Sequence, residues 1–355
     1  MIEIDGSQKS GSGTILRLSI ALAAITKQPL HIYNIRENRL QPGLKHQHLE
    51  AVLTAAKLCN TKVQGANLGS RELWFTPQQI SGGNVEAEIQ TAGSIPMLLL
   101  ATLPICLYAN NPVNLHVAKG GTDTTHAPTI NYLRFVLLPV LRQMSVDAAI
   151  NVQKYGYYPK GMGETTLIVK PNRELKPIQL EDFGELKRIS GVSVCTFLGD
   201  RQVAERQAKA AQDRFAQSGF NASIKVVNDE SNPFQKGSSI VLWVETDSGV
   251  IIGADAIGKL GKMSEAVGVE AAEKLLAELS VEPTVDVYLA DMLIPYMALT
   301  WGKSAFLVRT VSEHLETNIW LMEKMLNVQF TTQKINNLYR IEKSGEQNAE
   351  INRLL

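Results

Sequence analysis

The sequence predicts an α+β fold: a large domain of three repeated β-α-β-α-β-β units and a smaller inserted α/β domain. Two observations favour this organisation. A first succession of strand and helix patterns recurs after about 85 residues, which indicates stacked copies of one unit. A different pattern begins near residue 184, before the first one resumes. We therefore assign residues 1–183 and 280–343 to the large domain, 184–279 to the insertion and 344–355 to a polar C-terminal tail.

The first two units follow from apolar periodicity. In the first, MIEID, PLHIYNI, TKVQGAN and RELWFTP have strand character, whereas TILRLSIALAAIT and GLKHQHLEAVLTAAKLCN have helical spacing. In the second, NVEAEIQ, PVNLHVAKG, DAAINVQKYG and ETTLIVKP are the strands, and GSIPMLLLATLPICLYA and TINYLRFVLLPVLRQM are the helices. Each unit therefore has the order strand, helix, strand, helix and a final strand pair.

The remaining elements belong to the insertion and the third unit. The insertion has four predicted strands, ISGVSVCTFL, NASIKVV, SSIVLWVET and GVIIGADAIG, and two helices, RQVAERQAKAAQDRFAQSG and KMSEAVGVEAAEKLLAELS. The segment from residue 284 to 301 resumes the first pattern. FLVRTV, the helix NIWLMEKML and the strand pair VQFTTQ and NLYRIEK complete a third unit, which we expect to follow the insertion.

Composition indicates a globular protein and argues against a disordered or fibrous chain. Of 355 residues, 45% are hydrophobic and 20% charged, and the formal net charge is zero, so a nucleic-acid partner requires a local cluster of Arg and Lys. Cys59, Cys106 and Cys195 lie far apart in apolar runs, which predicts buried free thiols in a reducing cytosol. The apolar run 95–109 contains prolines and is shorter than the roughly 20 residues of a membrane span, so we expect a cytoplasmic protein.

Two polar segments of the first unit carry candidate phosphate-binding groups. GSQKSGSGTILR joins a strand to a helix, whose N-terminus favours anions, and Arg17 lies on its first turns. The segment lacks the Gly-Lys-Ser/Thr of a P-loop, so a simple tight connection remains open. In IRENRLQPGLKHQHLEA, Arg36 and Arg39 lie in a loop and Gln47 opens a helix. Guanidinium groups suit phosphate, although a solvated basic loop is equally compatible with this segment alone.

VSEHLETNIW contains the candidate nucleophile, His314. We expect residues 311–316 to be extended, with Ser312, His314 and Glu316 on one face, and a helix to begin near Ile319 behind a cap at 317 or 318. An imidazole with an ordinary pKa of about 6.5 is mostly neutral at pH 7 and can attack phosphorus. An exposed loop histidine is the alternative. His126 in AKGGTDTTHAP is a weaker candidate of the same kind.

Seven segments together resemble the RNA 3′-terminal phosphate cyclase family. They are DGSQ…GSGTILR, IRENRLQPGLKHQHL, GSI…LP, GGTDTTHAP, YYPKGMGE, VYLADML and EHLETNIW, and they follow one another in the family's order from residue 5 to residue 320. The resemblance implies a ligase that uses ATP, with Mg²⁺ or Mn²⁺, to convert RNA 3′-phosphate ends into 2′,3′-cyclic phosphates. It also implies a covalent histidine-AMP intermediate and then an RNA adenylate. It leaves open whether the chain forms a homodimer.

The resemblance also assigns roles to residues. The family's nucleophilic histidine corresponds to His314. Arg36 and Arg39 fall where phosphate- or RNA-binding groups are expected, and the nucleotide-binding positions are Arg17, Gln47, Pro128, Tyr288, Leu289, Ala290, Asp291 and Met292. No residue is assigned to the metal.

The chain departs from the family pattern at four positions. Ser10 stands where the family has a glutamate associated with metal and ATP, and Lys9 replaces a glycine. Leu100 and Met292 each replace a glutamine. A hydroxyl is a poor substitute for a carboxylate as a magnesium ligand, so we expect weaker metal binding, with Lys9 supplying part of the missing positive charge.

Two other functions fit parts of the sequence. The departures are compatible with a diverged paralogue that binds RNA or an RNA-processing partner without catalysis. An enolpyruvyl transferase would share the repeated fold, but it would have no use for His314.

Overall fold

The structure is a computed structural model, and it describes residues 1–345. It confirms an α+β fold with four separate four-stranded sheets. Residues 346–355, which make up most of the predicted polar tail, lie outside the described part of the chain.

The first sheet is built from residues 2–75. Its order is β1-β2-β4-β3, with β1 parallel to β2 and the other pairs antiparallel. The strands are β1 (Ile2–Asp5), β2 (Leu30–Tyr33), β3 (Val63–Gln64) and β4 (Leu73–Phe75), and the helices are α1 (Gly13–Thr26) and α2 (His46–Leu58).

The second sheet repeats this arrangement in the order β5-β6-β8-β7. Its strands are β5 (Gly83–Glu88), β6 (Val113–Gly120), β7 (Asp147–Lys154) and β8 (Gly163–Lys170). Its helical segments are α3 (Ile95–Leu107) and a continuous run of α4 (Ile130–Tyr132), the π-helix η1 (Leu133–Leu137) and α5 (Leu138–Gln143).

The third sheet has the same order and directions, β9-β14-β16-β15, but its first strand precedes the insertion. The strands are β9 (Gln179–Leu180), β14 (Ser304–Val308), β15 (Phe330–Ile335) and β16 (Leu338–Lys343), and the helices are α8 (Val287–Ala298) and α9 (Glu313–Leu326). The expectation that the insertion precedes the third unit was therefore wrong. Because β9 has only two residues, it left no alternating pattern to recognise.

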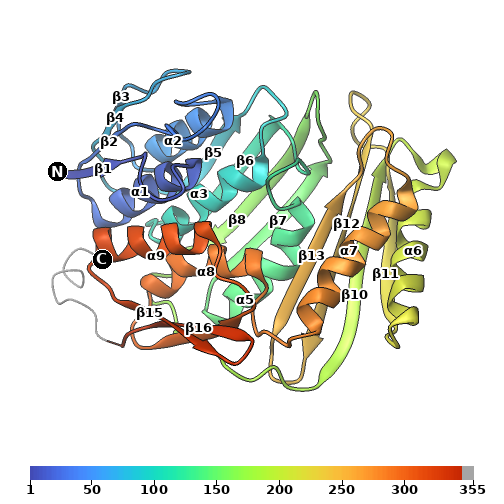
Figure 1. Cartoon of the computed structure of the whole chain (residues 1–355). Coiled ribbons are helices and arrows are strands. Elements are labelled where there is room, and N and C mark those ends of the chain that lie inside the picture. The colour runs from blue at the N-terminus through green and yellow to red at the C-terminus, as the bar shows by residue number, and fades with distance from the viewer. Residues whose placement is uncertain (346–355) are drawn as a thin grey trace.

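The fourth sheet belongs to the inserted segment and has the order β11-β10-β12-β13. It comprises β10 (Leu186–Thr196), β11 (Ala222–Asp229), β12 (Gly237–Thr246) and β13 (Ile251–Ile257), with a short 3₁₀ turn η2 (Gly199–Arg201). The helices α6 (Val203–Gln217) and α7 (Ser264–Leu279) cover one face of the sheet (Figure 1).

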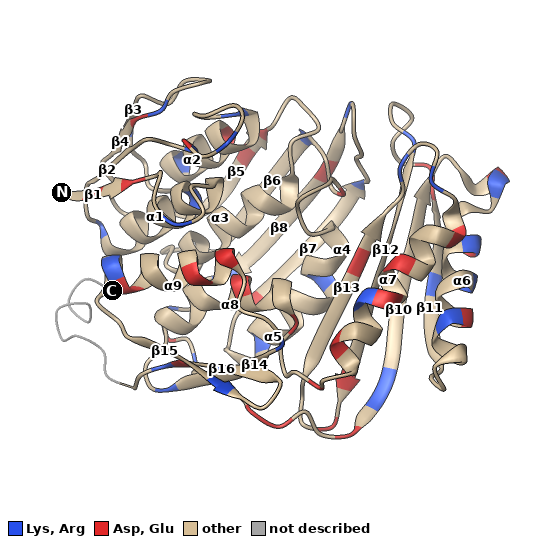
Figure 2. Ribbon diagram, viewed as in Figure 1, with Lys and Arg blue, Asp and Glu red and all other residues tan. Residues whose placement is uncertain are grey.

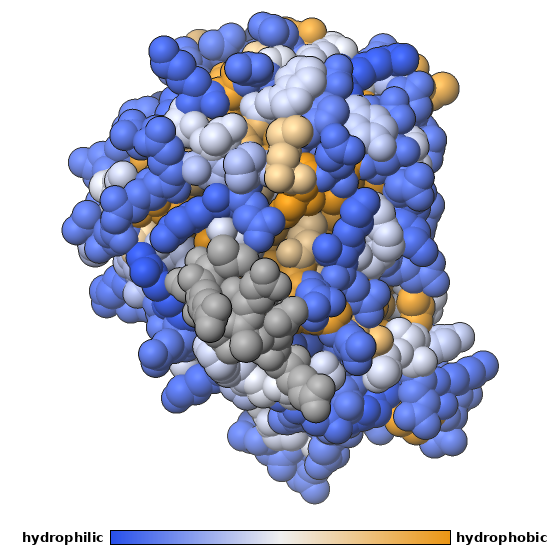
Figure 3. Space-filling model, turned by 90° about the vertical axis from the view of Figure 1, so that its left-hand side faces the viewer, coloured by the Kyte–Doolittle hydropathy of each residue, from blue (hydrophilic) through white to orange (hydrophobic). Residues whose placement is uncertain are grey.

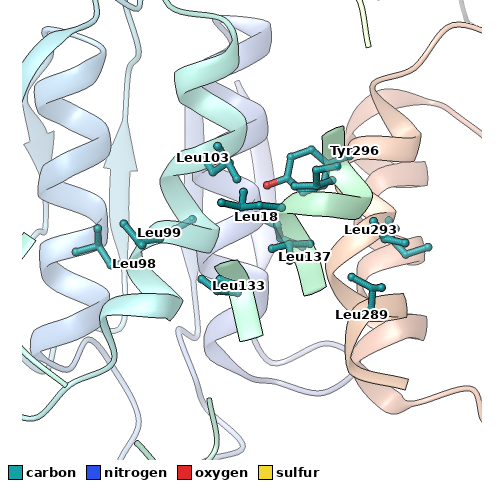
Figure 4. Close-up of a cluster of buried hydrophobic side chains, with 14 of the residues drawn as sticks. Leu18, Leu98, Leu99, Leu103, Leu133, Leu137, Leu289, Leu293 and Tyr296 are labelled. Atoms are coloured by element: carbon teal, nitrogen blue, oxygen red, sulfur yellow. The ribbon is translucent and has the colours of Figure 1, made fainter. Parts of the chain in front are cut away.

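A shared apolar core holds the helices of the large domain together. Leu18 of α1, Leu103 of α3, Leu137 of η1 and Leu293 of α8 converge on one another, and the ring of Tyr296 lies among them (Figure 4). These side chains are nearly or fully buried. Since burying a large apolar side chain stabilises a fold by about 1.5–3 kcal/mol, this cluster fixes the positions of helices from all three units.

Figure 3 shows one face of the molecule, on the β1 side. The face on the β1 side is largely hydrophilic, with an apolar strip in its middle (Figure 3). No helix among residues 1–345 is long and apolar enough to cross a bilayer. The three cysteines are buried and unpaired, as the sequence predicted.

Candidate active site

The glycine-rich first loop is attached to two helix N-termini. The side chain of Ser12 accepts a hydrogen bond from Thr14 N at 3.3 Å and caps α1, and its hydroxyl lies 3.0 Å from that of Ser10. The backbone N–H of Ser10 donates to Thr317 Oγ1 of α9 at 3.2 Å. The contact joins residues more than 300 positions apart and brings His314 and the first loop into one site.

The helix that carries His314 begins earlier than the sequence suggested. Ser312 caps it by accepting a hydrogen bond from Leu315 N at 2.9 Å, and α9 starts at Glu313. The expected extended stretch 311–316 and the cap at 317 or 318 were wrong. Leu315 lies two helical turns before Met322 on the same buried face of the helix, which favours the earlier start. His314 is therefore a first-turn residue, close to the positive end of the helix.

The N-termini of two further helices, α2 and α3, are connected to the first loop. Ser94 caps α3, and its backbone N–H donates to Gln47 Oε1 of α2 at 2.7 Å. A Cβ added to Gly13 of α1 would lie 2.3 Å from His48 Nε2 of α2, so α1 and α2 touch where both begin. The residue before α2, Lys45, forms no side-chain cap. The N-termini of α1, α2, α3 and α9 are thus linked in one chain of contacts.

Cations at this end of the molecule lack a carboxylate partner. Within the described residues, none of Arg17, Arg36 and Arg39 forms an ion pair. Burial and then the charge of Arg36 lower the pKa of Arg17 to about 10, so Arg17 still carries its charge near neutral pH. Because a partly buried cation without a counter-ion is costly, this arrangement suits an anionic ligand.

Arg36 differs from the other two arginines in how it is held. It is buried, and its Nη1 donates to the carbonyl oxygens of Gln41 at 2.9 Å and Gly43 at 2.7 Å. These bonds brace the loop that carries Arg39, which is exposed. Phosphate binding by Arg36 remains a prediction, and the visible role of Arg36 is to hold this loop closed.

The His314 ring is half-buried among cations. Burial lowers its pKa below the ordinary value, Arg17 and Arg39 lower it further, and Glu313 acts in the opposite direction. The imidazole is therefore neutral over a wider pH range than a free histidine. Its Nδ1 is buried and has no hydrogen-bond partner among the described residues. This leaves Nε2 as the nitrogen that an incoming group can reach.

Helix α8 offers only part of its predicted nucleotide-binding segment. Leu289 and Ala290 are fully buried, so their side chains belong to the core. Tyr288 is 55% exposed, and Asp291 and Met292 are half-buried. Any side-chain contact to a ligand from this segment must therefore come from Tyr288, Asp291 or Met292.

Asp291 connects α8 to α9. Its Oδ1 accepts a hydrogen bond from the hydroxyl of Ser312 at 2.6 Å, and its backbone oxygen accepts one from Asn318 Nδ2 at 2.6 Å. Burial, together with the carboxylate of Asp286, raises the pKa of Asp291 to about 7, against the effect of the Ser312 hydrogen bond. These two hydrogen bonds fix the first turn of α9, and with it His314, relative to Tyr288.

Comparison with known sequences identifies the family of this chain. The sequence profile of the RNA 3′-terminal phosphate cyclase family matches residues 8–332. The chain belongs to this family. Proteins named RNA 3′-terminal phosphate cyclase from Pyrobaculum aerophilum and Pyrococcus furiosus are 42% and 43% identical to it, over 97% and 93% of this chain and 98% and 94% of theirs. One from Methanopyrus kandleri is 41% identical over 92% of this chain and 94% of its own.

Other positions that the cyclase resemblance selected lie apart from this cluster. Pro128 precedes Thr129, whose backbone N–H donates to Asp255 of the inserted segment at 2.7 Å. No described contact joins Pro128 to His314 or Arg17, and its nucleotide-binding role remains a prediction. His126 is exposed in the same loop. By contrast, Lys9 is exposed within the first loop itself, next to Ser10, and Leu100 is half-buried on α3.

The residues present fit a protein-held divalent ion poorly. Among the described residues, no group of three His, Cys, Asp or Glu side chains is arranged to hold a metal. Ser10, where the resemblance implies a glutamate, is buried, and its hydroxyl pairs with that of Ser12. Since Mg²⁺ is usually held by one or two carboxylates together with phosphates and water, we derive no step through a metal.

Sequence reasoning missed several residues of this candidate site. Burial, followed by the charges of Arg17, Arg36 and Lys45, lowers the pKa of His48 to about 2, so its ring is neutral. Asn318 has a buried side-chain oxygen without a partner in the described chain. The caps Ser94 and Ser312 could have been found, because each serine directly precedes a helical apolar pattern. His48 and Asn318 gave no such local signal.

Proposed function

We propose that this chain converts RNA 3′-phosphate ends into 2′,3′-cyclic phosphates at the expense of ATP, through a covalent adenylate on His314. The observation that carries the proposal is the group of unpaired arginines beside four helix N-termini and a neutral imidazole. This combination suits a polyphosphate that reacts with a nitrogen nucleophile. Membership of the cyclase family supports the choice of reaction.

The proposed roles follow from charge and position. The triphosphate binds across the first turns of α1 and α2, where Arg17 and Arg39 compensate its charge. The adenosine lies toward α8, where the exposed ring of Tyr288 is available for stacking. Gln47 already uses its amide oxygen on Ser94, which leaves its NH₂ group to donate to a phosphate or ribose oxygen.

The first step is adenylyl transfer to His314. The lone pair of Nε2 attacks the α-phosphorus of ATP, the bond to the bridging oxygen of the β-phosphate breaks, and pyrophosphate leaves. The lowered pKa keeps the imidazole unprotonated. The arginines stabilise charge that develops on the transferring group and on pyrophosphate.

The second and third steps take place on RNA. A 3′-phosphate oxygen attacks the adenylate phosphorus, the P–N bond to His314 breaks, and the RNA carries AMP on its terminal phosphate. The neighbouring 2′-hydroxyl then attacks the 3′-phosphorus, loses its proton, and expels AMP. The cyclic phosphate is the product, and His314 returns to its starting form.

The test is a direct assay of product. An RNA oligomer with a 3′-phosphate is incubated with ATP and the protein, in the presence and absence of Mg²⁺ or Mn²⁺, and its end group is identified by mass spectrometry. The expected product has lost one water and resists phosphatase. An RNA end that stays unchanged under every divalent ion would favour a binding protein without catalysis.

A further inference from the structure

A pair of exposed aromatic side chains lies outside the site described above. Tyr158, in the hairpin between β7 and β8, is 78% exposed, and Phe234, in the loop before β12, is 60% exposed. Large aromatic rings on the surface of a soluble chain often mark a binding site. The hairpin belongs to the large domain and the loop to the inserted segment, and both lie along the upper edge in Figure 1.

The two loops are fastened to each other. Asn232 is fully buried, and its Nδ2 donates to the carbonyl oxygens of Tyr155 at 2.6 Å and Gly161 at 3.1 Å. Its Oδ1 accepts a hydrogen bond from Phe234 N at 3.1 Å. The backbone N–H of Lys160 donates to Gln235 Oε1 at 3.2 Å. Both rings are therefore presented on a braced surface, which lowers the entropy lost when a ligand binds.

Three lysines lie in the same two loops or opposite the start of β12. Lys160 follows Tyr158 by two positions, and Lys236 follows Phe234 by two. Lys259 lies opposite the start of β12, since the register pairs Ser239 with Ile257. All three are exposed, and none forms an ion pair within the described residues.

The basic tips of these loops are visible in Figure 2. One exposed carboxylate, Glu230, lies in the same loop as Phe234. The patch is thus mainly basic, although the whole chain has no net charge.

The hairpin is continuous with the active site. A Cβ added to Gly161 would lie 2.9 Å from Ala92 Cα, so the hairpin packs against the segment before α3. The same segment contains Ser94, which binds Gln47. Residues 92–94 therefore join the hairpin that carries Tyr158 to Gln47 of the candidate site.

We propose that Tyr158 and Phe234, with Lys160, Lys236 and Lys259, form a platform for single-stranded RNA upstream of the reacting 3′-phosphate. We call these five residues the aromatic platform. The rings stack on bases and the lysines contact backbone phosphates, a combination that binds single strands with little regard to sequence. The inference rests on the proposed function, because it takes the 3′ end to lie near His314.

Binding measurements that separate the platform from the reaction centre test this inference. The dissociation constant is measured for a 3′-phosphorylated oligouridylate of about eight nucleotides and for a dinucleotide, with wild type and with Tyr158→Ala and Phe234→Ala. Each variant should weaken binding of the longer RNA about tenfold and leave the dinucleotide unchanged. Tyr158→Phe, which keeps the ring, should bind like wild type. Trp301→Ala is the matched control, because Trp301 is also exposed but lies after α8 and in neither of the two loops.

Lysine variants and adenylation provide the remaining controls. Lys160→Ala and Lys236→Ala should each reduce the salt dependence of binding by about one phosphate contact. None of these variants should change labelling of the protein by ATP or its melting temperature. Equal affinity of wild type for the octamer and the dinucleotide overturns the platform, as does an unchanged octamer affinity in both alanine variants. Failure of the cyclase reaction alone would appear as absent product while the length dependence persists.

Discussion

Two regions of the molecule bury charged groups in opposite ways. Where the inserted segment meets the large domain, the carboxylate of Asp286 is satisfied from within the chain: it accepts hydrogen bonds from Tyr132 Oη at 2.7 Å and Gly253 N at 2.9 Å, and it caps α8. At the start of α1, Arg17 has a single described hydrogen bond, to Thr14, and no counter-ion. The first arrangement is complete without a ligand, whereas the second needs an anion.

The contrast teaches how to separate structure from function among buried charges. A charged group whose partners all come from the chain contributes to folding and to the relative position of elements. A charged group without partners costs stability, and such costs are common at binding and catalytic sites. The two regions should therefore respond oppositely to mutation.

Replacing Asp286 should have the largest effect on stability. Asp286→Ala leaves the N–H groups of Gly253 and the first turn of α8 without an acceptor, which should cost about 3 kcal/mol or more. Denaturant unfolding measures the loss, with Asp200→Ala, an exposed acid on η2, as the control. Asp286→Asn should be less harmful, because the amide keeps one acceptor. If the unfolding free energies of Asp286→Ala and Asp286→Asn both equalled that of wild type, a structural role of Asp286 would be contradicted.

Arg17 should show the reverse behaviour. Arg17→Ala should lower the rate of adenylyl transfer by about 100- to 1,000-fold, since it removes a cation aimed at developing charge. Its unfolding free energy should stay the same or rise, because an unpaired charge is lost. Arg188→Ala, which breaks a surface ion pair with Glu245, is the control and should leave the rate unchanged. A loss of stability comparable with that of Asp286→Ala would remove the distinction between the regions.

The acid limb of adenylyl transfer should report the cations near His314. In the proposed mechanism the neutral ring is the nucleophile, so the rate falls as the pH drops through its pKa, which burial, Arg17 and Arg39 hold below the ordinary value. Removing a positive neighbour raises that pKa. Arg39→Gln should therefore move the acid limb to higher pH, measured as the single-turnover rate against pH. An acid limb at the same pH as in wild type would show that the ring does not sense this charge.

The smallest predicted effect concerns Asp123, which lies where the large domain meets the inserted segment. Burial raises its pKa to about 7, and the Asp255 carboxylate contributes in the same direction, against hydrogen bonds from Ile130 N, Thr122 and Ser239. The folded state then binds this proton more tightly than the unfolded state, so stability declines as the pH rises from about 4 to about 7. Asp123→Asn should flatten that decline. Melting temperatures across this range measure it, and a slope equal to that of wild type would assign the pH dependence to other groups.

Much of the fold could be predicted because its signals are periodic. Strand alternation and helical spacing identified the repeated order of elements, and the cysteines followed from their apolar surroundings. The two-residue strand β9 was missed because two residues show no alternation. The start of α9 was missed because Ser312 was interpreted as extended chain, although its hydroxyl caps the helix.

The candidate site was harder to predict, because tertiary contacts decide what each residue can do. The sequence identified Arg36 as a cation but could not reveal that Gln41 and Gly43 occupy its Nη1. It grouped Leu289 with Tyr288, whereas the helix turns one into the core and the other outward. No local pattern shows that Thr317 holds the first loop. Residue types were predictable, and their partners were not.

The most direct test of the central claim is covalent labelling of the protein. Wild type and His314→Ala are incubated with α-labelled ATP and divalent ions, and the adenylated peptide is mapped by mass spectrometry. The account predicts one acid-labile adenylyl group on His314 of the wild-type protein and none on the variant. Label that persists in His314→Ala, or that maps to another residue, would contradict it.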